Sequence, residues 1–258
     1  RGPRSPLSPP VPGVLADDEL DAVRRTFGVA EAQVRRGHVI SHTLAAIASI
    51  GTDSVVFIGG TALSRTHLPG LRLSEDIDLI AMGRRDIVAG RIERAVTRGL
   101  QRSLGTPTFT PALRATHHPD PAALTVAGET IQLQMLAATG YPGWPSETVP
   151  IYQRYSDAPP ARLRVLTAPA FAAAKLSAWH DRHAARDLYD MWAMAEADMI
   201  DDEAKTLFAR SGPLTSASKV SFDPVPTDQS WDSALRHQCT PKVTARQAAD
   251  TVRAAWNH

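Results

Sequence analysis

A short segment around residue 60 constrains the fold of this chain more than any other part of the sequence. The β-branched and aromatic run of residues 54–58 predicts a short buried strand. Gly59 and Gly60 interrupt that run, and residues 61–67 can then begin a helix. A second strand is expected at residues 77–81, so the order strand, glycine turn, helix and strand predicts an α/β unit.

Asp76 and Asp78 stand two residues apart at the start of the second expected strand. Because side chains alternate along a strand, both carboxylates point to one face, roughly 6.6 Å apart along it. Charge on a strand that is otherwise apolar needs a partner or a metal, because burying an uncompensated charge is unfavourable. Magnesium prefers oxygen ligands, so the two aspartates are candidate catalytic residues that hold one or two Mg²⁺ ions.

The glycine turn that precedes these aspartates is suited to phosphate. Gly59 and Gly60 let the backbone approach a phosphate closely, and the following helix offers free N–H groups and the positive end of its dipole. The hydroxyls of Thr61 and Ser64 add hydrogen-bond donors. Turn and aspartates together predict a site for a nucleoside triphosphate whose phosphates are bridged by metal ions.

A second group of charged residues lies in a helix expected from residue 167 to about residue 196. With Lys175 at 0° on a helical wheel, three charged residues fall within roughly 60° of it: Arg182, Arg186 and Asp190. We interpret Lys175 and the arginines as groups that meet triphosphate oxygens. Asp190 either orients Lys175 or approaches the metal, the ribose or the base. The alternative is a solvated helix face with ion pairs.

The two stretches together resemble the nucleotidyltransferase superfamily of DNA polymerase β type. The first stretch is GGTALSR at residues 59–65 with SEDIDL at residues 74–79, and the second is Lys175, Arg182 and the run RDLYD at residues 186–190. More narrowly, the pairing is similar to the AbiEii/AbiGii (formerly DUF1814) toxin family. The resemblance spans about residues 55–195.

This resemblance implies an α/β (α+β) fold, in which a polymerase-β-type nucleotidyltransferase lobe with a mixed sheet is followed by a helical C-terminal lobe. It implies a Mg²⁺-dependent enzyme that transfers a nucleoside monophosphate from an NTP, together with a cognate antitoxin. The catalytic candidates are Asp76, Asp78, Lys175 and Asp190, of which Asp76 and Asp78 are also the metal ligands. The nucleotide-binding candidates are Gly59, Gly60, Thr61, Ser64, Arg65, Ser74, Arg182, Arg186 and Asp187.

One position departs from the superfamily pattern. Many polymerase-β-type enzymes carry a third carboxylate on a neighbouring strand, but the expected strand at residues 130–136 offers Gln132 and Gln134 instead. Glutamine can bind a metal through its oxygen but brings no charge and is a poor base. Either Glu129 or Asp190 replaces the missing acid, or the attacking hydroxyl is activated less directly. The number of metal ions stays open.

Arginines recur along the amphipathic helix expected at residues 86–102. Four of them cluster on one side, at Arg91, Arg94, Arg98 and Arg102. They form a candidate track for a nucleic-acid backbone or, alternatively, a solvated face. The resemblance to mycobacterial MenT-type toxins implies that the acceptor is the 3′ end of tRNA, whose modification blocks translation. Nucleotidylation of a protein or a small molecule such as an antibiotic, and a non-catalytic nucleotide-binding module, remain alternatives.

Composition limits the other possibilities. With 28 basic and 27 acidic residues, the whole protein has no strong field, so any nucleic-acid surface must be a local patch. No apolar run approaches the roughly 18 residues of a membrane span, so no membrane partner is expected. The lone cysteine, Cys239, excludes a disulfide framework within the chain and favours the cytoplasm.

The expected organisation has three parts. Residues 1–13 are rich in proline and are expected to form a flexible lead-in, residues 14–165 the α/β lobe, and residues 166–258 the helical lobe. Within the lobes, residues 14–27 and 30–50 predict helices, and residues 140–160 are expected to be a linker or long loop. Further helices are predicted near residues 201–210 and 242–256, with a loose stretch at residues 211–228.

Overall fold

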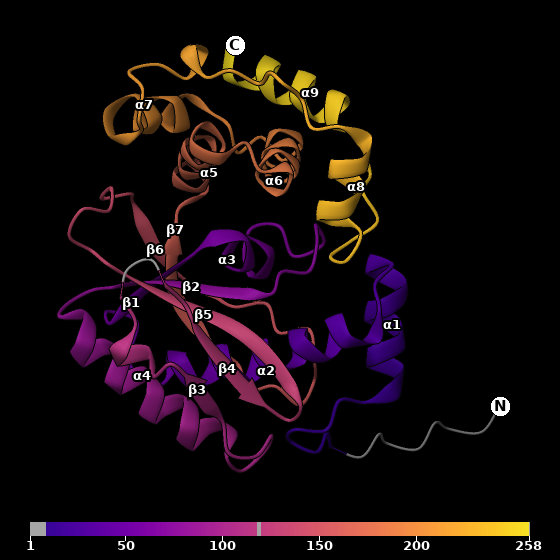
Figure 1. Ribbon diagram of the computed structural model, residues 1–258, viewed down its shortest axis with the longest axis vertical. Helices are drawn as coiled ribbons and strands as arrows, with labels where there is room; N and C mark the ends of the chain where they lie inside the picture. Colours follow the sequence, from indigo (N-terminus) through magenta and orange to yellow (C-terminus); the bar gives the residue numbers. More distant parts are fainter. Residues whose placement is uncertain (1–8, 118–119, 258) are drawn as a thin grey trace.

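A seven-stranded mixed sheet, with strand order β3-β4-β5-β2-β1-β7-β6, organises the computed structural model, which describes residues 9–117 and 120–257 (Figure 1). Strand β2 runs parallel to β5 and β1 runs parallel to β7, while the other neighbouring pairs are antiparallel. The strands are β1 (Val55–Ile58), β2 (Asp76–Ala81), β3 (Thr108–Thr110), β4 (Ala122–Val126), β5 (Glu129–Ala137), β6 (Ser146–Pro150) and β7 (Arg162–Leu166). This confirms the expected fold class, an α/β (α+β) chain with a mixed sheet.

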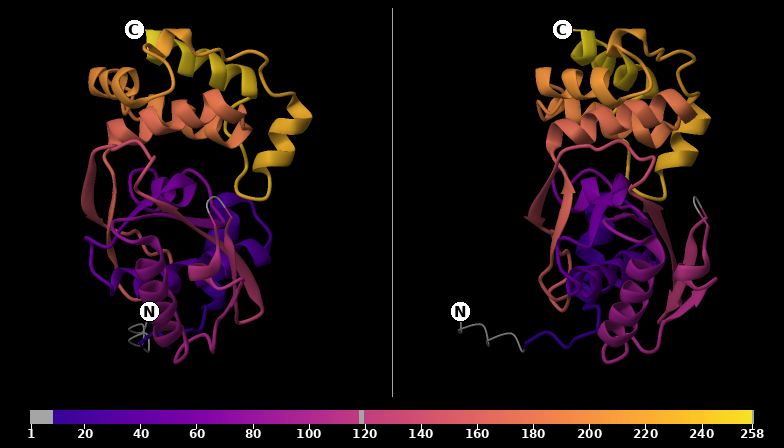
Figure 2. Two further views of the ribbon diagram at one scale, coloured as in Figure 1. Left: turned by 60° about the vertical axis from the view of Figure 1, so that its left-hand side comes forward. Right: turned by 90° about the vertical axis from the view of Figure 1, so that its left-hand side faces the viewer.

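The helices fall into two groups. Those of the first group precede, join or follow the early strands: α1 (Asp17–Phe27), α2 (Glu31–Ala48), α3 (Gly59–Arg65) and α4 (Arg85–Leu100). Those of the second group follow the last strand: α5 (Ala168–Arg182), α6 (Ala185–Glu196), α7 (Asp202–Ser211), α8 (Asp228–Leu235) and α9 (Ala245–Asn257). Figures 1 and 2 show the second group together at one end of the molecule, with α4 toward the other end.

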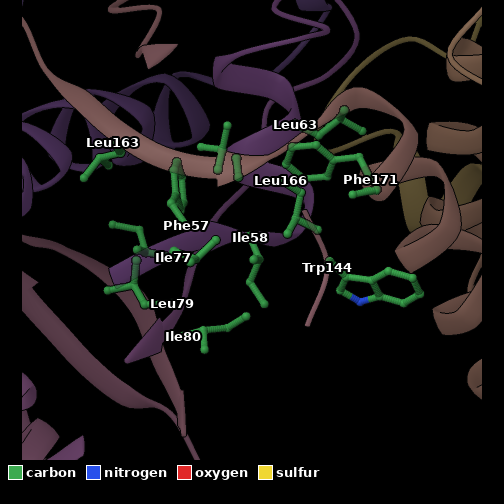
Figure 3. Close-up of a cluster of buried hydrophobic side chains, with 14 of the residues drawn as sticks. Phe57, Ile58, Leu63, Ile77, Leu79, Ile80, Trp144, Leu163, Leu166 and Phe171 are labelled. Atoms are coloured by element: carbon green, nitrogen blue, oxygen red, sulfur yellow. The ribbon is translucent and has the colours of Figure 1, made fainter. Parts of the chain in front are cut away.

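The middle of the sheet is apolar because β1 lies between two other strands. All residues of β1 are buried, and its neighbour β2 alternates buried Ile77 and Leu79 with the two aspartates. Figure 3 shows Ile77 and Leu79 lying together, and Phe171 of α5 beside Leu63 of α3 and Leu166 of β7. The same alternation that buries one face of β2 therefore presents Asp76 and Asp78 on the other.

Helices α2 and α4 pack closely against each other and against the sheet. Their approach depends on Gly99 near the end of α4, because a Cβ there would lie 2.7 Å from the Cβ of Ala46 in α2. Gly90, earlier in α4, has no such neighbour: its nearest contact would be the flexible end of Arg94 at 3.4 Å.

Most expected elements are confirmed, but three expectations are wrong. Residues 140–160 contain β6, an edge strand whose exposed residues gave no alternating apolar signal. The single helix expected at residues 167–196 is two helices, because His183 adopts a left-handed conformation with φ 48°. Helix α8 was not predicted, since its eight residues include only Trp231 and Leu235 as buried side chains.

The part of the expected lead-in at residues 1–8 lies outside the described residues. At its end, the backbone N–H of Gly13 donates a hydrogen bond to Asp157 Oδ2 at 2.8 Å. No helix within the described ranges is both long enough and apolar enough to cross a bilayer.

The two α4 glycines give a paired stability prediction. Gly90→Ala should stabilise the protein by about 0.5–1 kcal/mol, because alanine is the better helix former and has room. Gly99→Ala should instead destabilise it by about 1 kcal/mol, because overpacking against Ala46 exceeds the gain in helix propensity. Urea unfolding of both variants checks this. Equal stabilisation by the two changes would contradict the close α2–α4 contact.

Candidate active site

Asp76 and Asp78 lie two residues apart on β2, and both face a cleft of about 260 Å³. Parallel pairing with β5 sets Gln132 opposite Asp76 and Gln134 opposite Asp78. All four side chains line the cleft. The prediction that glutamines occupy the neighbouring strand beside the aspartates is therefore confirmed.

The glycine turn after β1 fits around this pair. Gly59 has φ 80°, in the left-handed region that favours glycine, and a Cβ on it would overlap Asp78 Oδ2. A Cβ on Gly60 would overlap the guanidinium of Arg72. The two glycines thus leave room for one carboxylate and one guanidinium at the edge of the cleft.

Lys175 of α5 forms the opposite wall. Its Nζ lies 2.9 Å from Asp187 Oδ1 and 2.6 Å from Asp190 Oδ2, both from α6. Arg182 closes the far side of Asp187 with two hydrogen bonds of 2.7 and 3.0 Å. Both carboxylates are 1% exposed and Lys175 is 7% exposed, so this network is almost fully buried.

Arg72 extends the network and was not among the predicted residues. Its Nε and Nη2 donate to the two oxygens of Asp190 at 2.7 and 2.8 Å, and Nη1 donates to Gln238 Oε1. The guanidinium also lines the cleft. A partial signal exists in the sequence, because Arg72 and Ser74 have the same parity as Asp76 and Asp78, and all four residues line the cleft.

The break between α5 and α6 corrects the helical-wheel placement of Asp187. On one continuous helix Asp187 falls away from the stripe, yet in the structure it lies at the centre of the network between Lys175 and Arg182. The turn at His183 and Ala184 redirects the chain, and neither residue is a glycine or proline that would announce a break. Arg186, at the start of α6, is exposed and also lines the cleft.

Several predicted nucleotide-binding residues do not line this cleft. Thr61 Oγ1 donates to the carbonyl of Asp76, and Ser64 Oγ donates to the carbonyl of Thr61. Arg65 is 2% exposed, with its guanidinium bonded to Ser41 Oγ and to the carbonyls of Gly37 and Tyr152. The structure gives these three side chains contacts within the protein. Ser74 and Gly60 do line the cleft.

The structure also narrows the roles that the sequence left open for Asp190. Asp190 is buried, forms ion pairs with both Arg72 and Lys175, and is not among the residues that line the cleft. Glu129 stands at the start of β5, opposite Val126, and is not a lining residue either. Among the described lining residues, Asp76 and Asp78 are the carboxylates without a direct ion pair.

The family described as "Nucleotidyl transferase AbiEii toxin, Type IV TA system" matches residues 42–253. The chain belongs to this family. The matched range includes both walls of the cleft. The expectation of an AbiEii nucleotidyltransferase toxin of a toxin–antitoxin system is confirmed, and the family description adds that the system is of type IV. No curated protein sequence shows significant similarity to the chain.

Two solved structures share the fold of this AbiEii toxin. MenT4, a nucleotidyltransferase toxin from Mycobacterium tuberculosis H37Rv, is similar with a TM-score of 0.66 and 18% identity, covering 92% of this chain and 88% of that chain. JHP933 from Helicobacter pylori is similar with a TM-score of 0.52 and 15% identity, covering 89% of this chain and 92% of that chain. At these identities the likeness establishes the fold.

The electrostatics of the AbiEii cleft favour a bound cation. Burial and the neighbouring charge of Asp76 raise the pKa of Asp78 to about 6, against the pull of Lys175, Arg182 and Arg186. Burial also raises the pKa of Asp76, which Arg186 opposes. Two half-buried carboxylates that repel each other and supply hard oxygen ligands fit a divalent cation such as Mg²⁺.

A second cavity of about 210 Å³ adjoins the AbiEii cleft and shares Asp78, Gln134, Lys175 and Arg182 with it. Its remaining wall is largely apolar and includes Tyr141 and Phe171. Burial and the charge of Asp78 raise the pKa of the Tyr141 hydroxyl to about 12, so it stays protonated and can donate a hydrogen bond. The composite space has a charged part and an apolar part.

The four arginines of the predicted stripe lie elsewhere in the AbiEii toxin, three on α4 and Arg102 just beyond its end. Arg91, Arg94, Arg98 and Arg102 are all exposed, and the Nη2 of Arg91 donates to the carbonyl of Ile50. None of the four lines the cleft. Figures 1 and 2 place α4 away from the end of the molecule that carries α5 and α6. The structure therefore does not join the arginine stripe to the aspartate pair.

Replacing Asp78 gives a pH-dependent prediction. Because the folded protein raises this pKa, it binds the proton more tightly than the unfolded chain, and stability falls as pH rises from about 4 through about 6. In EDTA at pH 8, Asp78→Asn should therefore stabilise the protein by about 1–2 kcal/mol, and at pH 4 the gain should vanish. Thermal unfolding across this range measures the difference.

Asp86→Asn is the control for that measurement. Asp86 is an exposed surface carboxylate whose pKa is lowered by its hydrogen bond from Arg84. Its replacement should give no gain at pH 8. If Asp78→Asn gave no more stabilisation of the metal-free protein at pH 8 than at pH 4, the two cleft aspartates would not repel each other as described.

Proposed function

We propose that this AbiEii toxin transfers a nucleoside monophosphate from an NTP to the 3′ acceptor end of tRNA, in a Mg²⁺-dependent reaction that blocks translation. The observation that carries the proposal is the convergence of two walls on one cleft. Asp76 and Asp78 from β2 face Lys175, Arg182 and Arg186 from α5 and α6 across a shared space. Carboxylates for a cation opposite cations for phosphate are the groups that phosphoryl transfer requires.

The cationic wall would bind the triphosphate. Arg186 is exposed and has an open approach to phosphate oxygens, while Lys175 and Arg182 present their charges from fixed positions. The acceptor hydroxyl would form a bond to the α-phosphorus as the bond to pyrophosphate breaks. Positive charge on this wall would stabilise the departing pyrophosphate. Asp187 and Asp190 position this wall and do not act on the substrate.

Asp76 and Asp78 would hold Mg²⁺, with Gln132 and Gln134 offering neutral oxygens beside them. When bound, the ion would neutralise charge on the phosphates and polarise the reacting phosphoryl group. Of the carboxylates that line the described cleft, only these two are available to bind a metal ion. Each ion would therefore have fewer protein ligands than in a site with three carboxylates. Gly59 and Gly60 keep the space around Asp78 and Arg72 open.

The adjoining apolar cavity is the proposed place of the nucleoside. A base needs a flat apolar contact and a few hydrogen bonds, and this wall supplies Phe171, Leu166 and the Tyr141 hydroxyl. The shared residues Asp78 and Lys175 would then lie between nucleoside and pyrophosphate. A cognate antitoxin, which membership of a toxin–antitoxin family implies, would restrain the activity.

Transfer of a labelled nucleotide tests the proposal directly. The protein is incubated with each of the four labelled NTPs, Mg²⁺ and total tRNA. Label in tRNA supports the proposal, label in protein or in a small molecule supports a different acceptor, and tight NTP binding without transfer supports a non-catalytic module. Asp76→Asn and Asp78→Asn should each abolish transfer while the proteins remain folded.

Arg186→Gln should separate binding from folding. Losing one charge-assisted contact to phosphate, worth about 1.5 kcal/mol, should raise the KM for NTP about tenfold. The melting temperature should stay unchanged, because Arg186 is exposed and outside the buried network. Arg210→Gln, an exposed arginine of α7, is the matched control. An unchanged KM in the Arg186 variant would contradict the assignment of this wall to phosphate.

The α4 arginines test the tRNA acceptor. Replacing Arg91, Arg94, Arg98 and Arg102 with glutamine should raise the KM for tRNA about tenfold or more, reduce its salt dependence and leave the KM for NTP unchanged. A control with the same charge loss replaces four exposed arginines outside α4: Arg24, Arg25, Arg35 and Arg210. If both variants weaken tRNA binding equally, the four arginines do not form the tRNA-binding surface. If neither does, the acceptor is bound elsewhere.

A further inference from the structure

A buried cluster of two histidines and one aspartate lies outside the cleft. His38 and His42 come from α2, and Asp157 comes from the segment between β6 and β7. Their exposed fractions are 5%, 4% and 7%, and their ligand atoms all lie within 4.8 Å of one another. The cluster shares no residue with the lining of the cleft or of the adjoining apolar cavity.

The donor atoms are close enough together to bind one ion after a small adjustment. His38 and His42 are four residues apart, so they project from successive turns of one helix face. Asp157 Oδ2 lies 2.9 Å from the Nε2 of each histidine. Ligands at about 2.0 Å from a tetrahedral ion are about 3.3 Å from one another, so a small movement of these side chains admits the ion.

More nitrogens surround one oxygen of Asp157 than its lone pairs can accept hydrogen bonds from. Asp157 Oδ2 lies within hydrogen-bond distance of three nitrogens, since Gly13 N is 2.8 Å away in addition to the two imidazoles. A carboxylate oxygen has two lone pairs for hydrogen bonds. With a metal, each Nε2 lone pair and Asp157 would bind the ion, the imidazole protons would reside on Nδ1, and the Gly13 N–H would orient the carboxylate.

We propose that His38, His42 and Asp157 form a zinc site. Two imidazoles and one carboxylate suit zinc and related first-row metals, whereas the all-oxygen aspartate pair suits Mg²⁺, so the two sites would select different ions. His42 and Asp157 border a cavity of about 530 Å³, from which water can complete the coordination. The ion ties together the chain near Gly13, α2 and the β6–β7 segment, so its role is to stabilise the fold.

Metal content and stability of the untagged full chain test this site. After dialysis against EDTA and removal of the chelator, the protein should take up one equivalent of Zn²⁺, which excess Mg²⁺ does not displace. At saturating zinc the melting temperature should rise by about 5 °C or more. Co²⁺ in place of Zn²⁺ should give the visible absorption of a tetrahedral nitrogen–oxygen site. A wild-type protein that retains no equivalent of zinc and gives no cobalt absorption overturns the proposal.

Two sets of variants locate the ion. The double variant His38→Gln/His42→Gln and the single variant Asp157→Asn should lose the equivalent of zinc and the thermal shift. His237→Gln, a half-exposed histidine, should keep both. The double variant Asp76→Asn/Asp78→Asn should also keep both, and zinc that disappears with the cleft aspartates would overturn the assignment. The wild-type titration decides the matter even if a cluster variant fails to fold.

Discussion

The chain of ion pairs Arg182–Asp187–Lys175–Asp190–Arg72, which is buried except for the exposed Arg182, fixes how the helices after β7 meet the sheet. Burying the other four charges is costly, and attraction offsets that cost only because each carboxylate lies between two cations. Their pKa values show which effect wins. Burial disfavours the charged forms of Lys175 and Asp190, yet their partners raise the pKa of the lysine and lower the pKa of the aspartate. Removing Asp190 would leave the buried guanidinium of Arg72 without its carboxylate partner.

The network also explains why the cleft keeps its polarity. Three cations share two carboxylates, so the wall formed by α5, α6 and Arg72 retains positive charge. Across from it, Asp76 and Asp78 repel each other and lack direct ion pairs among the described contacts. The charges of the two walls therefore do not fully compensate each other. A metal-bound triphosphate, which is negative on one side and carries a cation on the other, complements both walls at once.

The sequence predicted the parts of this site that depend on local period. Alternation along β2 placed Asp76 and Asp78 together, whereas Arg72 lies before the strand begins and was not predicted. Helical period failed at Asp187, because a left-handed residue at His183 divides the helix without a glycine or proline. Thr61 and Arg65 lie within the matching motif, yet tertiary contacts with the carbonyls of Asp76 and Gly37 decide where their polar groups go. Such long-range contacts have no local signature.

The two candidate metal sites differ in the kinds of ligand atoms that they offer. Around the cleft the donors are carboxylate and amide oxygens beside phosphate-binding cations, whereas the cluster on α2 pairs imidazoles with a single carboxylate. The cavity beside that cluster is also lined by Arg98 of α4 and by Arg102, just beyond the end of that helix. A zinc ion there would fix α2, and α2 packs directly on α4 through Ala46 and Gly99. The stability of the arginine-bearing surface would then depend on an ion distinct in chemistry from the one used at the cleft.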